Sequence, residues 1–179
     1  MFNTKKEVYM KGFETIEAGK LSENFIRLIG QEWMLVTAGE SGRFNTMTAS
    51  WGGIGYLWNK PVAFVFIRPQ RYTFGFMEAQ DGFTLSFLGE NNREALNICG
   101  TLSGREVNKV EQAGLTPVFS ASGQVAFAEA RYIVECKKMY AGFLDPEAFL
   151  DPILIDKFYP EKDFHKMYIA EVVKVWKKK

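Results

Sequence analysis

Residues 43–73 constrain the fold of this chain most strongly, because two strand-like runs and an arginine-rich turn lie close together there. The first run, residues 44–50, is dense in Ser and Thr and ends at Trp51, as expected for a strand with one polar face. The second run, residues 61–67, is apolar throughout, which predicts a strand buried on both faces. Arg68-Pro69-Gln70-Arg71-Tyr72-Thr73 follows directly. The pattern predicts β-structure that carries a cationic turn at the end of a buried strand.

The rest of the chain repeats the pattern of short strands with few helices. Residues 52–55 are glycine-rich without the spacing of a nucleotide-binding loop, and we interpret them as a loop. Asn91-x-x-Glu94 and Ser103-x-x-Glu106 have capping-box spacing and predict helices near residues 92–100 and 105–113. Further strands are expected at residues 33–38, 83–88, 124–128, 131–138 and 166–176. The strand at residues 33–38 is expected to form a hairpin with residues 44–50 across the turn at residues 39–42. Many short strands favour a mainly β barrel over an α/β layer, as one domain covering residues 1–179 with residues 1–20 as an N-terminal arm.

Charge and cysteine content exclude several classes of function. The 22 basic and 21 acidic residues give a net charge of +1, so the chain lacks the basic surface of a nucleic-acid-binding protein. Two cysteines without a CxxC motif, together with a single histidine, argue against a zinc site and predict reduced thiols near the core. No apolar run reaches ~18–20 residues, and the N-terminus has no apolar signal-peptide core, which predicts a cytoplasmic protein that does not enter the membrane.

The polar groups around residues 43–73 suggest what such a protein binds. Arg68 and Arg71 offer planar donor forks that match phosphate oxygens, and Thr73 adds a hydroxyl at a predicted helix N-terminus. Residues 45–50 offer hydroxyl, amide and backbone groups suited to the polar edge of a heterocycle. Together they suggest a phosphorylated aromatic cofactor. The alternatives are an ordinary half-exposed strand and a solvated turn.

The run NTMTASW, the apolar strand and the RPQRYT turn together resemble the flavin reductase-like proteins, with the flavoredoxin type most similar, over roughly residues 25–176. The resemblance implies an FMN-binding split β-barrel of Greek-key type with a few short flanking helices. It implies that the isoalloxazine ring and ribityl chain lie along Asn45, Thr46, Met47, Thr48, Ala49, Ser50 and Trp51. Trp51 is equally compatible with the core.

The same resemblance assigns the remaining site residues. Arg71 and Thr73 match the family's phosphate-binding turn, with Arg68 a weaker candidate. Ser103 and Lys109 match a segment that reaches the flavin, although a helix cap and a solvated lysine are the alternatives. His165 corresponds to a histidine near the nicotinamide, but the family's Gly-Asp-His is replaced here by Asp163-Phe164-His165, and a surface histidine is the alternative.

The function implied is an FMN-dependent oxidoreductase that takes hydride from NAD(P)H and passes electrons to a small-molecule or protein acceptor. Such chemistry belongs to the cofactor and requires no acid–base residue. A second hypothesis is a non-enzymatic FMN electron carrier reduced by a partner protein, and a third is a β-barrel binding module without a cofactor. FMN is expected rather than FAD, because the sequence has one compact phosphate site and no second glycine-rich loop. The family further implies a homodimer.

Overall fold

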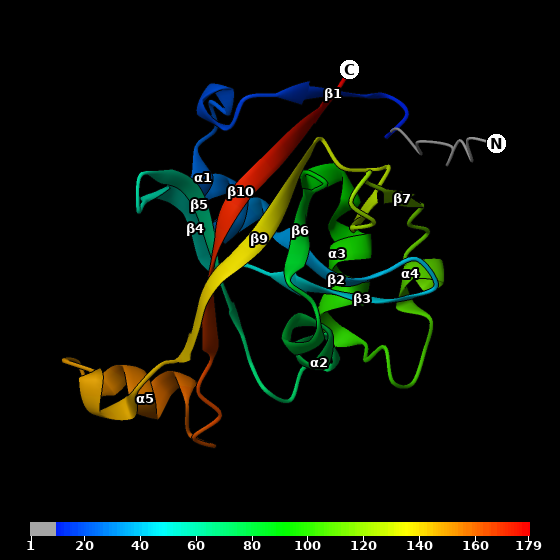
Figure 1. Ribbon diagram of the computed structural model, residues 1–179. Coiled ribbons are helices and arrows are strands. Elements are labelled where there is room, and N and C mark those ends of the chain that lie inside the picture. Colours follow the sequence, from blue (N-terminus) through cyan, green and yellow to red (C-terminus); the bar gives the residue numbers. More distant parts are fainter. Residues whose placement is uncertain (1–9) are drawn as a thin grey trace.

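A strongly curved antiparallel sheet forms the body of the computed structural model, which describes residues 10–179 (Figure 1). Seven strands follow the order β3-β2-β6-β9-β10-β5-β4, β1 pairs with β10, and β7 and β8 form a separate pair. The strand bounds are β1 Phe13–Ile16, β2 Met34–Glu40, β3 Arg43–Ala49, β4 Gly52–Leu57, β5 Lys60–Ile67, β6 Gly82–Phe87, β7 Pro117–Phe119, β8 Val125–Phe127, β9 Tyr132–Phe143 and β10 Lys166–Lys178.

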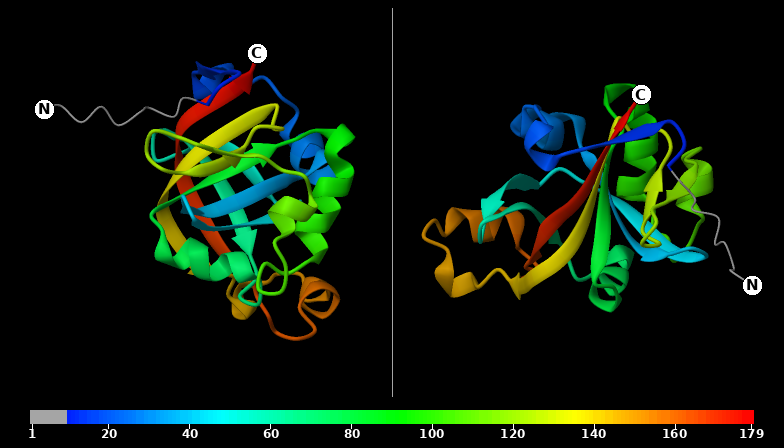
Figure 2. Two further views of the ribbon diagram at one scale, coloured as in Figure 1. Left: turned by 90° about the vertical axis from the view of Figure 1, so that its right-hand side faces the viewer. Right: turned by 45° about the horizontal axis from the view of Figure 1, so that its top comes forward.

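The sheet curls around a hydrophobic interior, and its path ends at two separate edge strands, β3 and β4 (Figure 2). This open curl is a split barrel, so the mainly β prediction is confirmed. The largest buried side chains in the main core include Tyr168, Phe83 and Phe87. Cys99 and Cys136 are buried free thiols, which confirms that prediction. The first nine residues of the predicted N-terminal arm lie outside the described part of the chain.

The predicted hairpin of β2 and β3 is confirmed, with Thr37 opposite Thr46 in the register. The loop interpretation of residues 52–55 is wrong, because these residues begin β4, which pairs with β5. The glycines are needed there for close packing. A Cβ on Gly53 would lie 2.3 Å from the Phe64 ring, and Gly52 has φ of +148° with the Phe64 carbonyl oxygen 2.5 Å from where its Cβ would stand.

Short helices cover the ends and one side of the sheet: α1 Phe25–Arg27, α2 Tyr72–Ala79, α3 Arg93–Thr101, α4 Lys109–Gln112 and α5 Ile153–Phe158. A π-helical turn, Leu28–Glu32, extends α1. The helix predicted near residues 105–113 is shorter, because Asn108 rather than Ser103 caps it by accepting from the Glu111 N–H. Asn92 occupies the N-cap position of α3 and makes no side-chain capping bond, so the capping box predicted from Asn91 is also wrong.

A long excursion between β9 and β10, residues 144–165, was not anticipated from the sequence. It carries the 3₁₀ turn Pro146–Ala148 and α5, and it lies beyond the lower end of the barrel in Figure 1. Its two ends are joined by a hydrogen bond from the Leu144 N–H to the His165 carbonyl oxygen, 2.9 Å long. An ion pair between Arg68 and Asp163 fixes it to the end of β5. The excursion therefore stands beside the strand ends that the sequence predicted as a site.

No helix in residues 10–179 has the length and apolar character needed to cross a membrane. The same residues contain no group of three or more His, Cys, Asp or Glu placed to hold a metal ion.

Candidate functional site

The end of β3 forms one wall of a cavity of about 190 Å³. Eight of the predicted residues line it, five of them at or just after the end of β3, and the others come from the turn after β5 and from the residue before β10. The lining residues are Met47, Thr48, Ala49, Ser50, Trp51, Phe66, Arg68, Arg71 and His165. Residues far apart in sequence thus meet where the resemblance places the flavin ring, and Trp51, with 41% of its surface exposed, is not a core residue.

Thr46 differs from its neighbours on β3, because its side chain is turned into the interior. Its hydroxyl lies 2.8 Å from the hydroxyl of Thr37 and 3.3 Å from the carbonyl oxygen of Val36. The residue is fully buried and lines neither this cavity nor the two cavities described below. Thr46 therefore stabilises the β2–β3 pair, and only its backbone remains available to a ligand.

Asn45 and Thr73 bind each other. The Asn45 side-chain amide donates to the Thr73 hydroxyl over 2.7 Å, and both residues are buried. The prediction of Thr73 as an N-cap is wrong, because Arg71 occupies that position and Thr73 lies inside α2. Gly104 packs so closely on the same amide that a Cβ would stand 2.2 Å from its oxygen. Asn45 thus joins β3, the first turn of α2 and the 103–106 turn.

Two cations face a second cavity, of about 130 Å³, at the N-terminal end of α2. Arg71 and Lys109 both line it together with Ser103, and Arg71 also lines the first cavity. Within residues 10–179 neither cation lies within 4 Å of a carboxylate. An unpaired guanidinium and an unpaired ammonium beside one cavity make a site for an anion.

Lys109 is only 3% exposed, so its reading as a solvated side chain is wrong. Its ammonium donates to the carbonyl oxygens of Cys99 and Leu102 at 3.2 and 3.3 Å, which leaves one N–H free. Burial lowers the pKa of Lys109 to about 8; the Cys99 thiol acts to raise it and Arg71 lowers it further. Burial also lowers the pKa of Arg71. An anion bound between these groups relieves both effects.

Arg68 has its partners within the chain. Its guanidinium forms an ion pair with Asp163 and donates to the Phe158 carbonyl oxygen at 2.8 Å. Asp163 accepts a further bond from Gln70, 2.5 Å long, and these partners hold the pKa of its carboxyl below the usual value despite the opposing effect of burial. Arg68 therefore fixes the 144–165 excursion in place, and we do not assign it to the phosphate.

His165 stands at the other end of the first cavity and is 7% exposed, so it is not a surface histidine. Its ring centre lies 5.0 Å from that of Trp51 and 6.5 Å from that of Phe66. Its Nδ1 lies 2.9 Å from the Tyr159 hydroxyl. Burial lowers the pKa of His165 to about 4, and Arg68 lowers it further while Asp163 acts to raise it, so the ring is neutral at pH 7.

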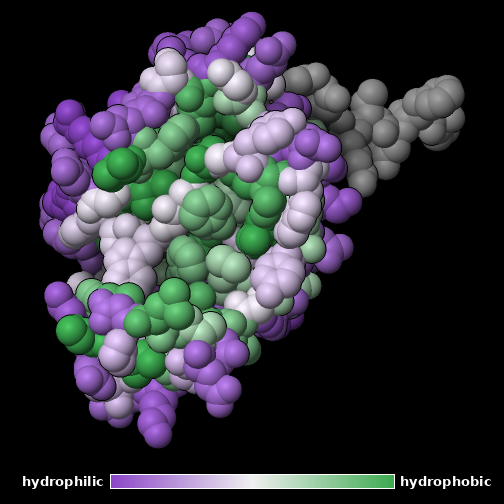
Figure 3. Space-filling view, turned by 90° about the vertical axis from the view of Figure 1, so that its left-hand side faces the viewer, coloured by the Kyte–Doolittle hydropathy of each residue, from purple (hydrophilic) through white to green (hydrophobic). Residues whose placement is uncertain are grey.

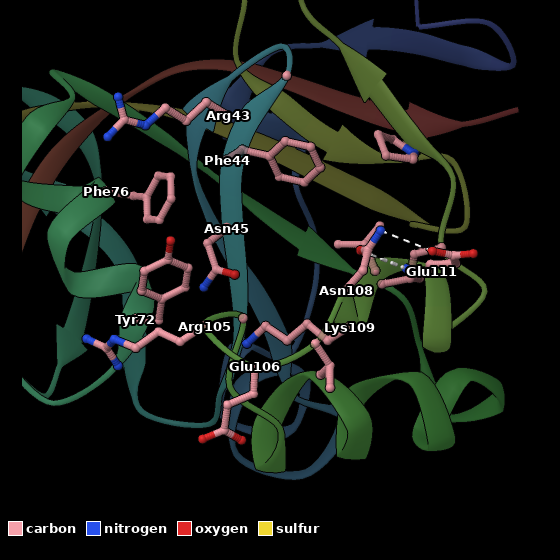
Figure 4. Close-up of a pocket in the computed structure, with 16 residues that line it drawn as sticks. Arg43, Phe44, Asn45, Tyr72, Phe76, Arg105, Glu106, Asn108, Lys109 and Glu111 are labelled. Carbon is pink, nitrogen blue, oxygen red and sulfur yellow. Dashed lines mark hydrogen bonds between the residues drawn. The ribbon is translucent and has the colours of Figure 1, made fainter.

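A larger cavity of about 790 Å³ lies beside these two, between the tip of the β2–β3 hairpin and residues 104–117 (Figure 4). Of the predicted site residues, only Asn45 and Lys109 line this cavity. Figure 4 shows the Lys109 side chain extending toward Asn45 and Tyr72 at its floor. Its other cations are Arg43 and Arg105, and Arg105 lies 4.9 Å over the Tyr72 ring and donates to the Gln70 carbonyl oxygen.

Sequence reasoning missed the aromatic support of the site. Phe66 was assigned only to a buried strand, and Tyr159 drew no attention because it lies within an excursion of no recognisable pattern. Gly100 also lines the second cavity, where a Cβ would stand 3.3 Å from the Cβ of Thr48. The close spacing between α3 and β3 at this glycine has no local signal in the sequence.

Residues 26–179 match the model of the family described as "Flavin reductase like domain". Among curated proteins none matches the chain significantly. An FMN-binding domain of a flavin reductase-like enzyme from Shewanella baltica has a TM-score of 0.67 at 20% identity, with 93% of this chain and 77% of that chain covered. A flavoredoxin from Methanosarcina acetivorans has a TM-score of 0.64 at 17% identity, covering 83% and 69%. An NADH:FAD oxidoreductase from Streptomyces globisporus has a TM-score of 0.61 at 17% identity, with 82% of this chain and 75% of that chain covered. At these low identities the TM-scores show that the chain shares its fold with these proteins.

Proposed function

Because the chain belongs to the flavin reductase-like family, we propose that it binds FMN and acts as an oxidoreductase, taking hydride from NAD(P)H and passing electrons to an acceptor. The observation that carries this proposal is the pair Arg71 and Lys109, two cations without an acidic partner in residues 10–179, beside a cavity that adjoins the end of β3. The site offers a place for one phosphate group and, next to it, a place for a ring.

At the phosphate end, the Arg71 guanidinium supplies a fork of donors and Lys109 supplies one free N–H. Ser103 lines the same cavity, and its hydroxyl accepts from the Arg105 N–H at 3.2 Å, so its own hydrogen is free for an anion. Asn45 and Thr73 hold the turn of α2 in place from behind. One compact anion site supports FMN over FAD.

At the ring end, residues 47–50 of the chain offer backbone groups beside the cavity, and Trp51 and His165 close it. Hydride acceptance and electron release in one or two steps are the chemistry that FMN would supply when bound here. The residues around it orient the ring and exclude water. His165 is neutral and so offers one N–H donor without adding a charge.

We also propose that two copies of the chain associate. The two cavities, of about 190 and 130 Å³, are each smaller than the ~300 Å³ of an ordinary ligand pocket, so a second subunit is expected to complete the walls. Figure 3 shows apolar side chains around a hollow on the face where β4, β5 and α5 lie. Exposed large apolar side chains on β4, on the turn to β5 and on α5 include Tyr56 at 72%, Trp58 at 55% and Ile153 at 67%. Burying such a face takes an interface on the order of 2,000 Å².

An electron carrier reduced by a partner protein is the second candidate, since nothing in the phosphate end distinguishes it from an enzyme. The structurally similar Streptomyces protein is an NADH:FAD oxidoreductase, and this likeness favours the enzyme. The discriminating feature is the ring end, where a nicotinamide must reach the flavin beside His165 and Trp51.

One series of measurements tests these proposals. The purified protein is expected to be yellow, acid extraction is expected to release FMN, and anaerobic NADH or NADPH is expected to bleach the flavin. Recovery of mostly FAD would contradict the cofactor proposal. A bound flavin that neither nucleotide bleaches would contradict the enzyme and support the electron carrier. A protein that binds no flavin would overturn both. Light scattering at micromolar concentration is expected to give twice the 20.4 kDa chain mass, and the mass of one chain would exclude the dimer.

A further inference from the structure

The 144–165 excursion returns to the barrel at Tyr159, and this tyrosine is held tightly although no function has been assigned to it. It is 4% exposed, and its N–H donates to the Ile155 carbonyl oxygen at the end of α5. Its ring stacks on Phe164 with centres 4.8 Å apart, and the Arg68 guanidinium lies 5.3 Å above it. The packing fixes the position of the one polar group of the side chain, the hydroxyl.

That hydroxyl meets Nδ1 of His165 at 2.9 Å, and the surroundings decide which atom donates. Among residues 10–179 the phenol has no other hydrogen-bond acceptor in reach. If Nδ1–H donated to the phenol oxygen, the phenol hydrogen would be buried without a partner among residues 10–179, which is unfavourable. The phenol therefore donates, Nδ1 accepts, and the hydrogen of the neutral imidazole resides on Nε2.

The other nitrogen of the ring forms no hydrogen bond within residues 10–179. His165 lines the cavity at the end of β3, between Trp51 and Arg68. Trp51 and Phe66 restrict rotation of the imidazole, and Arg68 is engaged by Asp163. What the ring presents to a ligand is thus a single uncharged donor.

We propose that Tyr159 is a positioning residue that fixes His165 as the Nε2–H tautomer and so aims one neutral donor at a carbonyl oxygen of the ligand held at the end of β3. The identity of that ligand, a flavin ring or the carboxamide of a nicotinamide, rests on the proposed function. The tautomer itself does not, because Tyr159 sets it in the protein alone. The inference is therefore testable without any cofactor.

The chain offers an unambiguous readout, because His165 is its only histidine. Long-range proton–nitrogen correlation spectra of the full-length protein, labelled with ¹⁵N-histidine and free of ligand at pH 7, report which nitrogen carries the proton. The expected spectrum has a protonated Nε2 and an unprotonated, hydrogen-bonded Nδ1. In Tyr159→Phe, the Nδ1 resonance is expected to move to the value of an imidazole without that bond, and the second tautomer is expected to become populated.

Tyr168→Phe is the matched control, since this second buried tyrosine donates its hydroxyl to Glu78 at 2.7 Å and not to the histidine. It is expected to leave the His165 resonances unchanged. A protonated Nδ1 in the wild-type protein would overturn the proposal even if Tyr159→Phe failed to fold. An unchanged Nδ1 resonance in a folded Tyr159→Phe would overturn it as well.

The functional consequence is tested with FMN-loaded protein. Tyr159→Phe is expected to retain FMN affinity while its reduction by NAD(P)H slows by about 10-fold, because small misalignments of reacting groups are costly. A flavin-replete variant that is reduced at the wild-type rate would remove the positioning role. If the wild-type protein binds no flavin, the proposed function fails while the tautomer measurement still decides the role of Tyr159.

Discussion

The two ends of the site are built on opposite electrostatic principles. At the end near α2, Arg71 and Lys109 remain without an acidic partner among the described residues, so the site is electropositive and incomplete without an anion. At the other end, Arg68 is paired with Asp163, and His165 is held neutral. Arg68 and Arg71 lie on the same turn, yet only one is available to a ligand. The partners of a charged side chain, rather than its type, indicate what it binds.

The same contrast predicts that acid impairs one end of the site and base impairs the other. The neutral end depends on His165 remaining unprotonated, so it is sensitive to acid. The cationic end depends on Lys109 remaining protonated, so it is sensitive to base. Four measurements sharpen or break this comparison.

The largest effect is expected in acid, from His165. Its folded pKa of about 4 lies below the ordinary value of 6.5, so between these values the unfolded chain binds more protons than the folded one. Stability present above pH 6.5 is therefore lost as the pH falls toward 4, by ~3 kcal/mol in total. Urea unfolding of wild type and His165→Gln over this range measures the difference. Carboxyl groups such as those of Glu78 and Asp163 contribute equally to the pH dependence of stability in both proteins. Parallel pH profiles of wild type and His165→Gln would therefore contradict the account.

The next effect is expected on removal of the free guanidinium. Arg71→Ala should weaken FMN binding by about 1.5–3 kcal/mol, the contribution of a charged hydrogen bond. Flavin fluorescence titration measures the change. Arg43→Ala is the control, because Arg43 lines the larger neighbouring cavity but not the two cavities of the proposed site. Loss of affinity in Arg43→Ala with none in Arg71→Ala would place the phosphate in the larger cavity.

Asn45→Ala is expected to act on folding. The change removes the donor to Thr73 and the contact with Gly104, and should lower the free energy of unfolding by about 1–2 kcal/mol. Exposed Asn91, which makes no side-chain hydrogen bond to the described residues, serves as the control in Asn91→Ala. Denaturant unfolding compares the two. An Asn45→Ala variant of unchanged stability that has lost FMN would instead make Asn45 a direct ligand.

The smallest effect is expected in base, at Lys109. Since its pKa in the free protein is about 8, FMN affinity should fall as the pH rises through that value, by up to about 1.4 kcal/mol per pH unit. Lys109→Met should bind more weakly at pH 7 and lose this pH dependence. Titrations between pH 7 and 9.5 measure both. Persistence of the same dependence in Lys109→Met would assign it to another group.

Part of the cationic end could be predicted from the sequence, because Arg71 lies in a short cationic turn after an apolar strand, whereas Ser103 was assigned by the family resemblance. The hairpin of β2 and β3 was predictable for the same reason, since its alternation and its glycine turn are local. The predictions of helix caps were wrong. Asn108, not Ser103, caps α4, and Arg71, not Thr73, occupies the N-cap position of α2. Side chains that satisfy each other through tertiary contacts, as Asn45 and Thr73 do, leave no local signal.

The ring end was less predictable because long-range packing builds it. His165 was found by resemblance, but its burial, its neutrality and its bond to Tyr159 all depend on how residues 144–165 fold back. The glycines of β4 were misread for a related reason. Their role is to admit Phe64 across the sheet, a contact that the sequence does not display.

A crystal structure of the protein with FMN bound tests the central claim most directly. The account predicts the phosphate within ion-pair distance of Arg71 and Lys109, and the ring along residues 47–50 with one carbonyl oxygen facing Nε2 of His165. FMN bound instead in the larger cavity, with its phosphate on Arg43 or Arg105, would contradict it.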